Sequence, residues 1–403
     1  MFNSLITPWR LKWYSFAILF GIFLAVLIAI FSGNGPDILS GRLGGDFPAF
    51  YAAGRIVTTV GFNGLYDIDN QIESQKGLFP DRKGFLPFPY PPFVALAYAP
   101  LSLLPYRIAY ALNLLVNISA FLVAFVCLKK SIPELTEFLV PVFVLSLTFY
   151  PLLKANLNGQ NSAITLMLFA SIWRLTKENR EYLAGFFMGL LLYKPQFAIP
   201  LIGLFVLSGR LKIALSGVVT GCLIIAVGLF FTGVQPYEQW YIFLKWFVPT
   251  DANLNGHNAI SWIGFLDAVF GTQNRMVIIL GYACCFATVF IISYVWTVGR
   301  TKSDFNAQMG FAAVSFVLIP PHMMYYDAGL IVLTYSVIIT KINRRKIELI
   351  FLVWVAGMTQ IVADKIGFSP IFFLVVSTFF ISLVTIAAPA MQNNIIKPIS
   401  ENS

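Results

Sequence analysis

The sequence has little charge. Asp, Glu, Lys and Arg make up 11% of its 403 residues, whereas they make up about 25% of a typical soluble protein. Hydrophobic residues account for 58% of the chain, and the mean hydropathy is +0.78. This composition excludes an ordinary soluble protein. The net charge of +9 does not indicate a nucleic-acid partner, because in a membrane protein the positions of basic residues matter more than their sum.

Several catalytic and metal-binding motifs are also absent from the sequence. It contains no glycine-rich phosphate loop followed by Lys-Ser/Thr, no His-Glu-x-x-His and no Cys-x-x-Cys. The Asp67-Ile-Asp69 triplet is short and lies in a predicted outer loop, where no nucleotide sugar is expected. The sequence therefore predicts no metal site and no cofactor. The cysteines lie inside apolar runs and indicate no disulfide framework; they are Cys127, Cys222, Cys284 and Cys285.

Long apolar runs are what the sequence does contain. A bilayer core takes about 20 helical residues to cross. We predict twelve spanning helices, at approximately 13–31, 106–128, 137–153, 160–175, 183–193, 196–208, 213–232, 275–299, 306–319, 324–340, 347–364 and 370–389. Two shorter stretches, 92–104 and 259–271, are predicted to be re-entrant or interfacial helices. The predicted fold class is an all-α integral membrane protein, with residues 1–403 in one polytopic domain.

Basic residues orient these helices. With the N-terminus in the cytoplasm, every short inner loop carries Lys or Arg, as the positive-inside rule requires. The predicted inner residues are Arg10, Lys12, Lys129, Lys130, Arg174, Lys177, Arg180, Arg210, Lys212, Arg300, Lys302, Lys341, Arg344, Arg345, Lys346 and Lys397. Both termini are then cytoplasmic. Residues 32–105 form a first outer loop with a helix over Pro48–Val60, and residues 233–274 form a second outer loop.

Polar motifs interrupt the apolar pattern on the outer side. Lys194-Pro195-Gln196 lies at the centre of an apolar stretch over 183–207, where proline disrupts a helix and lysine is costly. Either it is a tight turn with a lysine that reaches outward, or it is an anion site beside free helix-end amides. Asn156–Asn161 and Pro320–Asp327 allow the same two interpretations: a capped turn, or side chains that bind a sugar or phosphate.

The first outer loop adds a carboxylate and aromatic residues. Asp46 follows two glycines, and it could cap the helix that begins near Pro48, face a substrate, or do both, since a capped carboxylate is a positioned one. The Phe88–Pro92 segment is stiff and aromatic, and is either an interfacial anchor or a wall of a lipid or sugar site. One carboxylate, one lysine, one histidine and several amides suit transfer from a phosphate-linked donor to a hydroxyl. Because no nucleotide supply is expected outside the cytoplasm, we expect a polyprenyl-phosphate sugar as donor.

At these motifs the sequence resembles glycosyltransferase family 87, whose members are polyprenol-phosphate-mannose-dependent mannosyltransferases of the GT-C type. The resemblance runs from about residue 40 to 340. It is carried, in order, by Gly44-Gly45-Asp46-Phe47 with Tyr51 and Ala53, Leu65-Tyr66-Asp67, Tyr90-Pro91-Pro92, Gly159-Gln160-x-Ser162, Lys194-Pro195, and Pro321-His322 with Tyr326-Asp327.

The resemblance implies a GT-C membrane fold and an inverting, metal-independent transfer of a hexose, commonly mannose. It implies that Asp46 is the catalytic base and that His322 lies near the donor phosphate. We assign donor binding to Lys194, His322, Gln160, Asn161, Tyr326 and Asp327, and the acceptor or lipid groove to Tyr51, Tyr90, His257 and Asn258. The expected partners are the donor, a glycolipid or glycan acceptor and membrane lipids, at the outer face of a bacterial inner or plasma membrane.

Two other functions remain open. A transporter or flippase of lipid-linked sugars would need coupling charges at mid-membrane, and few acidic residues lie within the predicted spans. A glycan polymerase or ligase would also use lipid-linked donors at the outer face. Such enzymes usually depend on arginines in a large outer loop, and the outer loops proper contain only Arg42, Arg55 and Arg82.

Overall fold

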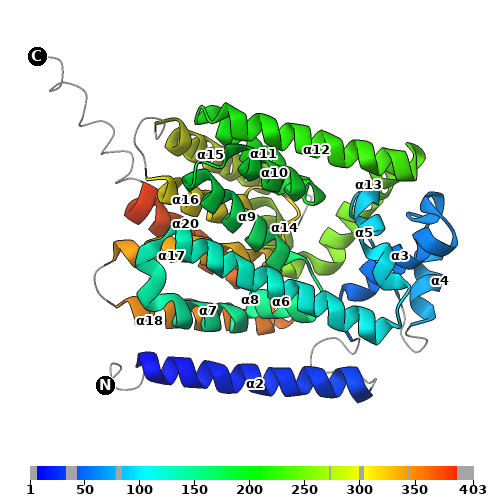
Figure 1. Ribbon diagram of the computed structural model, residues 1–403, viewed down its shortest axis with the longest axis horizontal. Helices are drawn as coiled ribbons and strands as arrows, with labels where there is room; N and C mark the ends of the chain where they lie inside the picture. Colours follow the sequence, from blue (N-terminus) through cyan, green and yellow to red (C-terminus); the bar gives the residue numbers. More distant parts are fainter. Residues whose placement is uncertain are drawn as a thin grey trace, which may run out of the picture.

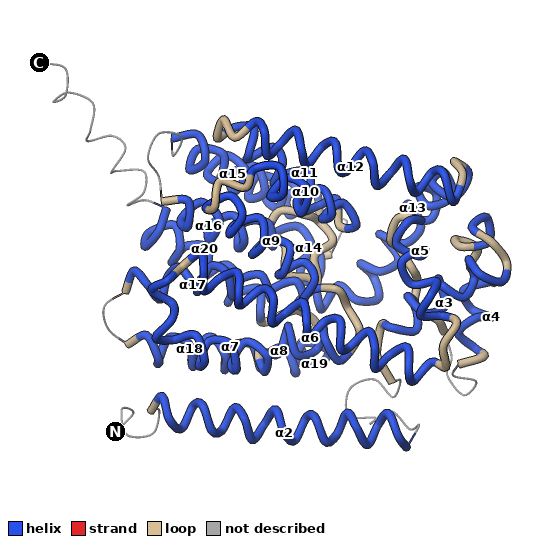
Figure 2. Tube along the Cα trace, viewed as in Figure 1, coloured by secondary structure: helices blue, strands red, loops and turns tan. Residues whose placement is uncertain are grey.

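The structure is a computed structural model that describes residues 7–32, 43–78, 84–271, 274–298, 304–342 and 345–387. These residues are almost entirely helical, and the β-structure among them is limited to one bridge between Ala259 and Met324 (Figure 2). The α-helices are α2 (Pro8–Ser32), α3 (Phe47–Thr59), α4 (Ile68–Lys76), α5 (Pro92–Ser102), α6 (Tyr106–Ser131), α7 (Leu139–Thr148), α8 (Tyr150–Leu157), α9 (Ser162–Lys177), α10 (Glu181–Leu190), α11 (Pro195–Leu207), α12 (Leu211–Thr232), α13 (Gln235–Asn255), α14 (Trp262–Phe270), α15 (Arg275–Val298), α16 (Phe305–Leu318), α17 (Ile331–Lys341), α18 (Lys346–Met358), α19 (Ala363–Ile366) and α20 (Ile371–Ser382).

Short 3-10 and π segments connect or extend several of these helices. They are η1 (Phe62–Gly64), η2 (Pro133–Phe138), η3 (Leu191–Tyr193), η4 (Gly256–Asn258), η5 (Tyr325–Leu330), η6 (Thr359–Val362) and the π segment η7 (Leu383–Ala387). Most lie at a proline, a glycine or a polar motif, where regular helical hydrogen bonding is interrupted.

Each predicted span contains helix, but the helices differ in length. Within the described residues, five are long and apolar enough to cross a membrane: Trp13–Phe31, Tyr106–Ser131, Leu211–Thr232, Arg275–Thr297 and Lys346–Ile366. A sixth candidate is the segment 133–157, which is bent by 57° between α7 and α8. The chain is therefore an integral membrane protein by length and composition, and the count of twelve crossings stays a prediction.

The two outer loops are more helical than their composition indicates. The helix predicted over Pro48–Val60 is confirmed as α3, and the short apolar stretches are confirmed as α5 and α14. No helix was predicted in the second loop between 233 and 258, yet α13 occupies most of this segment. Its aromatic side chains explain this, since Phe243 and Phe247 are buried against α3 and its neighbours. Residues 33–42, 79–83 and 272–273 of the two loops lie outside the described residues.

The molecule has two packed parts. The main core lies between the long helices and includes the fully buried Trp173 and Trp296. A second, aromatic core joins α3, α5, α13 and the start of α6, and contains Phe47, Phe50 and Phe88. Figure 1 shows α3, α4, α5 and α13 gathered at one end of the bundle, where α12 ends and α6 begins.

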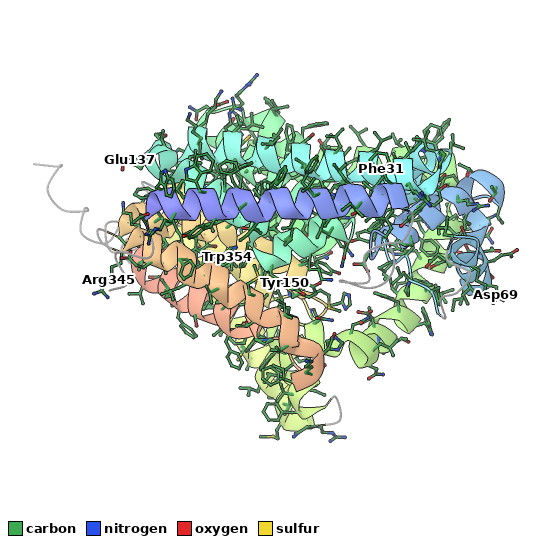
Figure 3. The ribbon with its side chains drawn as sticks, turned by 90° about the horizontal axis from the view of Figure 1, so that it is seen from below. Phe31, Asp69, Glu137, Tyr150, Arg345 and Trp354 are labelled. Atoms are coloured by element: carbon green, nitrogen blue, oxygen red, sulfur yellow. The ribbon has the colours of Figure 1, made fainter. Side chains whose placement is uncertain are left out.

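Basic residues gather at the opposite end of the bundle. Figure 3 shows Arg345 and Glu137 at that end and Asp69 at the other. Contacts tie further helix termini to the same end: Lys177 donates to the Ser131 carbonyl of α6, and Lys341 pairs with Asp304 at 2.8 Å. This separation agrees with the charge pattern, while the assignment of either end to the cytoplasm stays a prediction. Arg300, Lys302, Arg344 and Lys397 lie outside the described residues.

Helices α10 and α12 approach each other through glycines. A Cβ atom on Gly189 would lie 2.5 Å from the Thr220 side chain, and one on Gly185 would lie 2.5 Å from the Ile213 carbonyl. The glycines are four residues apart on α10, and Gly217 and Gly221 have the same spacing on α12. Small residues at this spacing allow close helix packing in membranes.

We therefore expect Gly189→Ala to lower the thermal unfolding midpoint of the detergent-purified protein. The new methyl group would force α10 and α12 apart, and overpacking typically costs about 1–3 kcal/mol. Gly203→Ala in α11 is the matched control, because a Cβ there meets nothing within 4 Å and alanine favours a helix by about 1 kcal/mol. Equal midpoints for the two variants would contradict the close packing.

Candidate active site

Asp46 is held at the start of α3 by main-chain contacts with the end of α8. The amides of Asp46 and Phe47 both donate to the carbonyl of Asn158, at 3.0 and 2.9 Å. Gly44 and Gly45 precede them with φ values of +86° and +47°. A Cβ on Gly45 would lie 2.4 Å from the Asn158 side chain, so glycine is required for this approach.

The carboxylate of Asp46 is bonded outside its own helix. It makes no capping hydrogen bond with α3, which rules out the cap that the sequence allowed. Instead, Oδ2 accepts a hydrogen bond from Gln160 Nε2 at 2.9 Å. The side chain of Asp46 is only partly buried. The first outer loop and the break between α8 and α9, which are far apart in the sequence, thus meet at this carboxylate.

Tyr90 extends this hydrogen-bond chain. Its hydroxyl donates to Gln160 Oε1 at 3.3 Å and lies 3.5 Å from Asn161 Oδ1. Burial, followed by the nearby charge of Asp327, raises the pKa of Tyr90 well above its usual value. The phenol therefore stays protonated at neutral pH and acts as a donor. With its oxygen occupied by Tyr90, Gln160 presents its NH₂ group to Asp46.

The position of Tyr90 is set by the first outer loop. Gln71 and Gln75 of α4 are buried and hydrogen-bond the main chain just before Tyr90. The Tyr66 hydroxyl donates to the Tyr90 carbonyl at 2.6 Å, and the Trp240 indole donates to the preceding carbonyl at 2.9 Å. Helices α4 and α13 together fix an otherwise irregular segment.

Lys194 and Asp327 form a buried ion pair. Their Nζ and Oδ1 atoms are 2.7 Å apart, and the two side chains are 4% and 8% exposed. Lys194 lies at the predicted break, with non-helical backbone between η3 and α11 and with Pro195 at the first helical position. The sequence allowed a lysine that reaches outward or an anion site at this break, and in the structure Asp327 balances the charge of Lys194. Pairing explains how lysine is tolerated at a buried position.

Tyr326 lies near both this ion pair and Asp46. Its partly buried side chain is close enough to Asp327, Tyr90, Asp46 and Asp251 to experience their charges. The predicted residues Asp46, Gln160, Asn161, Tyr90, Tyr326, Lys194 and Asp327 therefore form one polar cluster, which we call the Asp46 cluster. It draws on five segments that are distant in sequence.

Each of the two histidines faces an aspartate. His322 Nε2 lies 3.5 Å from Asp251 Oδ2, and His257 Nε2 lies 2.5 Å from Asp364 Oδ1. Asn258, the neighbour of His257, accepts a hydrogen bond from Gln360 at 3.0 Å. The aspartate partners were missed in the sequence, because pairing across about 70 or 107 residues leaves no local pattern.

The second outer loop is joined to the segment that carries His322. Ile260 donates its amide to the Met323 carbonyl, and the Ser261 hydroxyl donates to the Pro321 carbonyl, both at 2.9 Å. Tyr51, the remaining predicted residue, is buried in the aromatic core, and its hydroxyl donates to the Leu104 carbonyl at 2.8 Å. The structure thus brings His322 and His257 together on one side, and it does not bring the Tyr51 hydroxyl to the Asp46 cluster.

Lys154 is a charged residue of this region that the sequence analysis did not select. It lies on α8, is 8% exposed, and experiences the charges of Asp46 and Asp364. Its position between an apolar run and the Asn156–Asn161 motif could have indicated that Lys154 belongs to the site. A lysine at the end of a span is ordinarily explained by the membrane interface, however, and this explanation concealed its burial.

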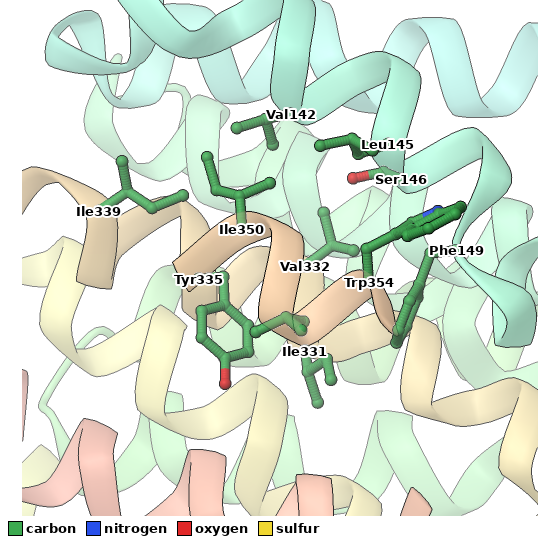
Figure 4. A pocket seen from close by; sticks show the side chains of 11 residues that line it. Val142, Leu145, Ser146, Phe149, Ile331, Val332, Tyr335, Ile339, Ile350 and Trp354 are labelled. Carbon is green, nitrogen blue, oxygen red and sulfur yellow. The ribbon is translucent and has the colours of Figure 1, made fainter. Parts of the chain in front are cut away.

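An apolar pocket lies between α7, α17 and α18. Figure 4 shows Phe149 and Trp354 at one side of it and Ile339 at the other. Its lining is apolar apart from the hydroxyls of Ser146 and Tyr335 and the Trp354 indole N–H. Phe149 is followed by Tyr150, whose ring packs against Tyr325 with centroids 5.9 Å apart. The pocket therefore ends next to the residues that adjoin the Asp46 cluster.

Comparison with known families gives one match. The model of glycosyltransferase family 87 matches residues 88–321, which is more than half of the chain. No curated protein matches. Asp46 and Asp327 lie outside the matched range, but each is bonded to a residue inside it: Asp46 to Gln160, and Asp327 to Lys194.

The buried ion pair makes a prediction for stability. Lys194→Met leaves the Asp327 carboxylate buried without its partner, and breaking such a pair costs about 3–5 kcal/mol. We expect a large loss of thermal stability in detergent for Lys194→Met and for Asp327→Asn. The double variant should lose much less than the sum, because neither charge then remains.

The exposed pair of Lys212 and Glu181 is the control. Its atoms are 3.2 Å apart and its side chains are 66% and 36% exposed, so Lys212→Met should have little effect. Strictly additive losses from Lys194→Met and Asp327→Asn would show that the two charges do not stabilise each other.

Proposed function

Because the chain belongs to glycosyltransferase family 87, we propose that it transfers a hexose, with mannose as the first candidate, from a polyprenyl-phosphate donor to a hydroxyl group. Family membership makes the protein a membrane glycosyltransferase with a sugar donor and an acceptor as substrates. The polyprenyl-phosphate donor, the lipid-linked or envelope glycan acceptor and the outer-face location are our proposal.

The position of Asp46 carries this proposal. A general base needs a carboxylate that is held in place, can be reached by a substrate and is not consumed by its own helix. Asp46 is fixed through its main chain by Asn158, is oriented by Gln160 and is only partly buried. In a protein that transfers sugars, such a carboxylate is suited to take the proton of an acceptor hydroxyl.

The proposed reaction is a single displacement. The acceptor oxygen attacks C1 of the sugar while its proton passes to Asp46. The bond between C1 and the phosphate oxygen breaks, and its electron pair stays on the phosphate. Because the acceptor attacks opposite the leaving phosphate, the configuration at C1 is inverted. The proposal requires no metal or other cofactor.

The remaining cluster residues are assigned to the donor. Gln160 and Asn161 provide amides, Tyr326 provides a phenol, and His322 is the candidate for contact with the phosphate. Lys194 and Asp327 neutralise each other, so we assign them to shaping the donor site rather than to supplying net charge. Tyr90, His257 and Asn258 are assigned to the acceptor side. The Tyr51 hydroxyl is already bonded to Leu104, so we assign its ring to packing of the groove.

The apolar pocket supports a lipid-linked substrate. It ends at Phe149, next to the aromatic pair of Tyr150 and Tyr325. A substrate with a sugar-phosphate head and an isoprenoid chain has a polar part that suits the Asp46 cluster and an apolar part that suits the pocket. We place the reaction at the outer face of a bacterial inner membrane, where a preactivated lipid donor replaces the nucleotide sugars of the cytoplasm.

The test is a transfer assay with the purified protein, a panel of polyprenyl-phosphate hexoses and a membrane lipid extract as acceptor. Products are identified by mass spectrometry. Asp46→Asn should lower the rate by at least about 100-fold, which is the usual lower limit for loss of a general base. Asp69→Asn is the matched control in the same loop, because Asp69 is exposed, and its rate should stay unchanged.

Two outcomes count against the proposal. Full activity in Asp46→Asn would remove Asp46 from the reaction. Movement of intact lipid-linked sugar across proteoliposomes, with no new glycosidic bond, would instead favour a flippase.

A further inference from the structure

Lys154 lies on α8, one helical turn before Asn158, the residue that binds the Asp46 main chain. Asn158, whose carbonyl binds the amides of Asp46 and Phe47, donates its own amide to the Lys154 carbonyl at 2.8 Å. The two residues are four positions apart, so they share a face at the end of the helix. The Lys154 side chain is buried on that face.

Lys154 is also the lysine that is coupled to Asp46. Its ammonium group experiences the charge of Asp46 first and that of Asp364 second. Lys194, by contrast, is held by Asp327 at 2.7 Å. The charged groups that act on Lys154 are Asp46 before α3 and Asp364 of α19. Tyr150 and Tyr325 of η5 lie near Asp364 as well, and Tyr325 also lies near Asp46. Asp364 is 81% exposed and is already in contact with His257.

The proposed reaction moves a negative charge away from Asp46. Before transfer, Asp46 is ionised and the donor phosphate, esterified on both sides, carries one negative charge. After transfer, Asp46 holds the acceptor proton and is neutral, while the released lipid phosphate is a monoester that can carry a second negative charge. A nearby cation with a flexible stem can stabilise both distributions, and lysine has such a stem.

We propose that Lys154 is the charge-compensating residue of this site, which keeps Asp46 ionised before transfer and stabilises the phosphate anion that transfer releases. This inference rests on the proposed function. The C1–O bond to the phosphate breaks, the C1–O bond to the acceptor forms, the proton moves to Asp46, and the electron pair moves to the phosphate. Lys154 keeps its own protons throughout.

The kinetic test compares Lys154→Met with Lys154→Arg, using polyprenyl-phosphate mannose as donor and the membrane lipid extract as acceptor. Lys154→Met should lower kcat at least about tenfold, with a smaller change in the KM for the donor. In the pH profile of kcat/KM, the acidic limb of this variant should move to higher pH, because loss of a neighbouring cation raises the pKa of the Asp46 carboxyl group. Lys154→Arg should restore much of the rate and the original limb. Lys245→Met, on the exposed surface of α13, should behave as the parent protein.

The proposed interaction between Lys154 and Asp46 can also be tested without a sugar-transfer assay. Lys154→Met should lower the thermal unfolding midpoint, and Asp46→Asn in the same chain should recover part of the loss, because the negative charge that Lys154 compensates is then gone. This result separates failure of the inference from failure of the proposed function, since it needs no substrate. Two results would overturn the role of Lys154. One is an acidic limb of kcat/KM that stays at the same pH in Lys154→Met, and the other is an unfolding midpoint of the double variant that does not recover.

Discussion

The candidate site depends on two amide groups that bind one carbonyl. The main-chain N–H groups of Asp46 and Phe47 donate to Asn158, and this contact seats the first outer loop on the broken end of α8. Without it, Gln160 would have no fixed carboxylate to orient, and Asp46 would not be held at Asn158, one helical turn along α8 from Lys154. The glycines before Asp46 are what allow the two segments to come this close.

Charged and titratable groups are arranged in pairs around this contact. Lys194 is matched by Asp327, His322 by Asp251 and His257 by Asp364. In a membrane protein, an uncompensated buried charge is costly, so the buried Asp327 allows Lys194 to lie where the apolar core would otherwise exclude it. A reaction that moves charge from a carboxylate to a phosphate needs an environment of this kind, in which cations are already present and held in place.

Much of the architecture could be predicted from the sequence, because apolar run lengths and proline positions act locally. The break at Lys194-Pro195, the helix after Asp46 and the short helices α5 and α14 all follow from such signals. The pairings could not be predicted, since Asp327 lies 133 residues from Lys194 and only the folded chain brings them together. Helix α13 was missed for a related reason, because its aromatic residues gain much of their burial from distant residues of the second core, such as Tyr66 against Phe243.

The central claim is that sugar transfer occurs at the Asp46 cluster. The most direct measurement is a cryo-electron microscopy structure of the protein with a non-transferable polyprenyl-phosphate mannose analogue. Our account predicts that C1 of the sugar lies beside the Asp46 carboxylate, with the phosphate near Asn161, Lys154 and His322 and the isoprenoid chain toward the apolar pocket. A sugar bound at the opposite, basic end of the bundle, or one separated from Asp46 by the Lys194–Asp327 pair, would contradict it.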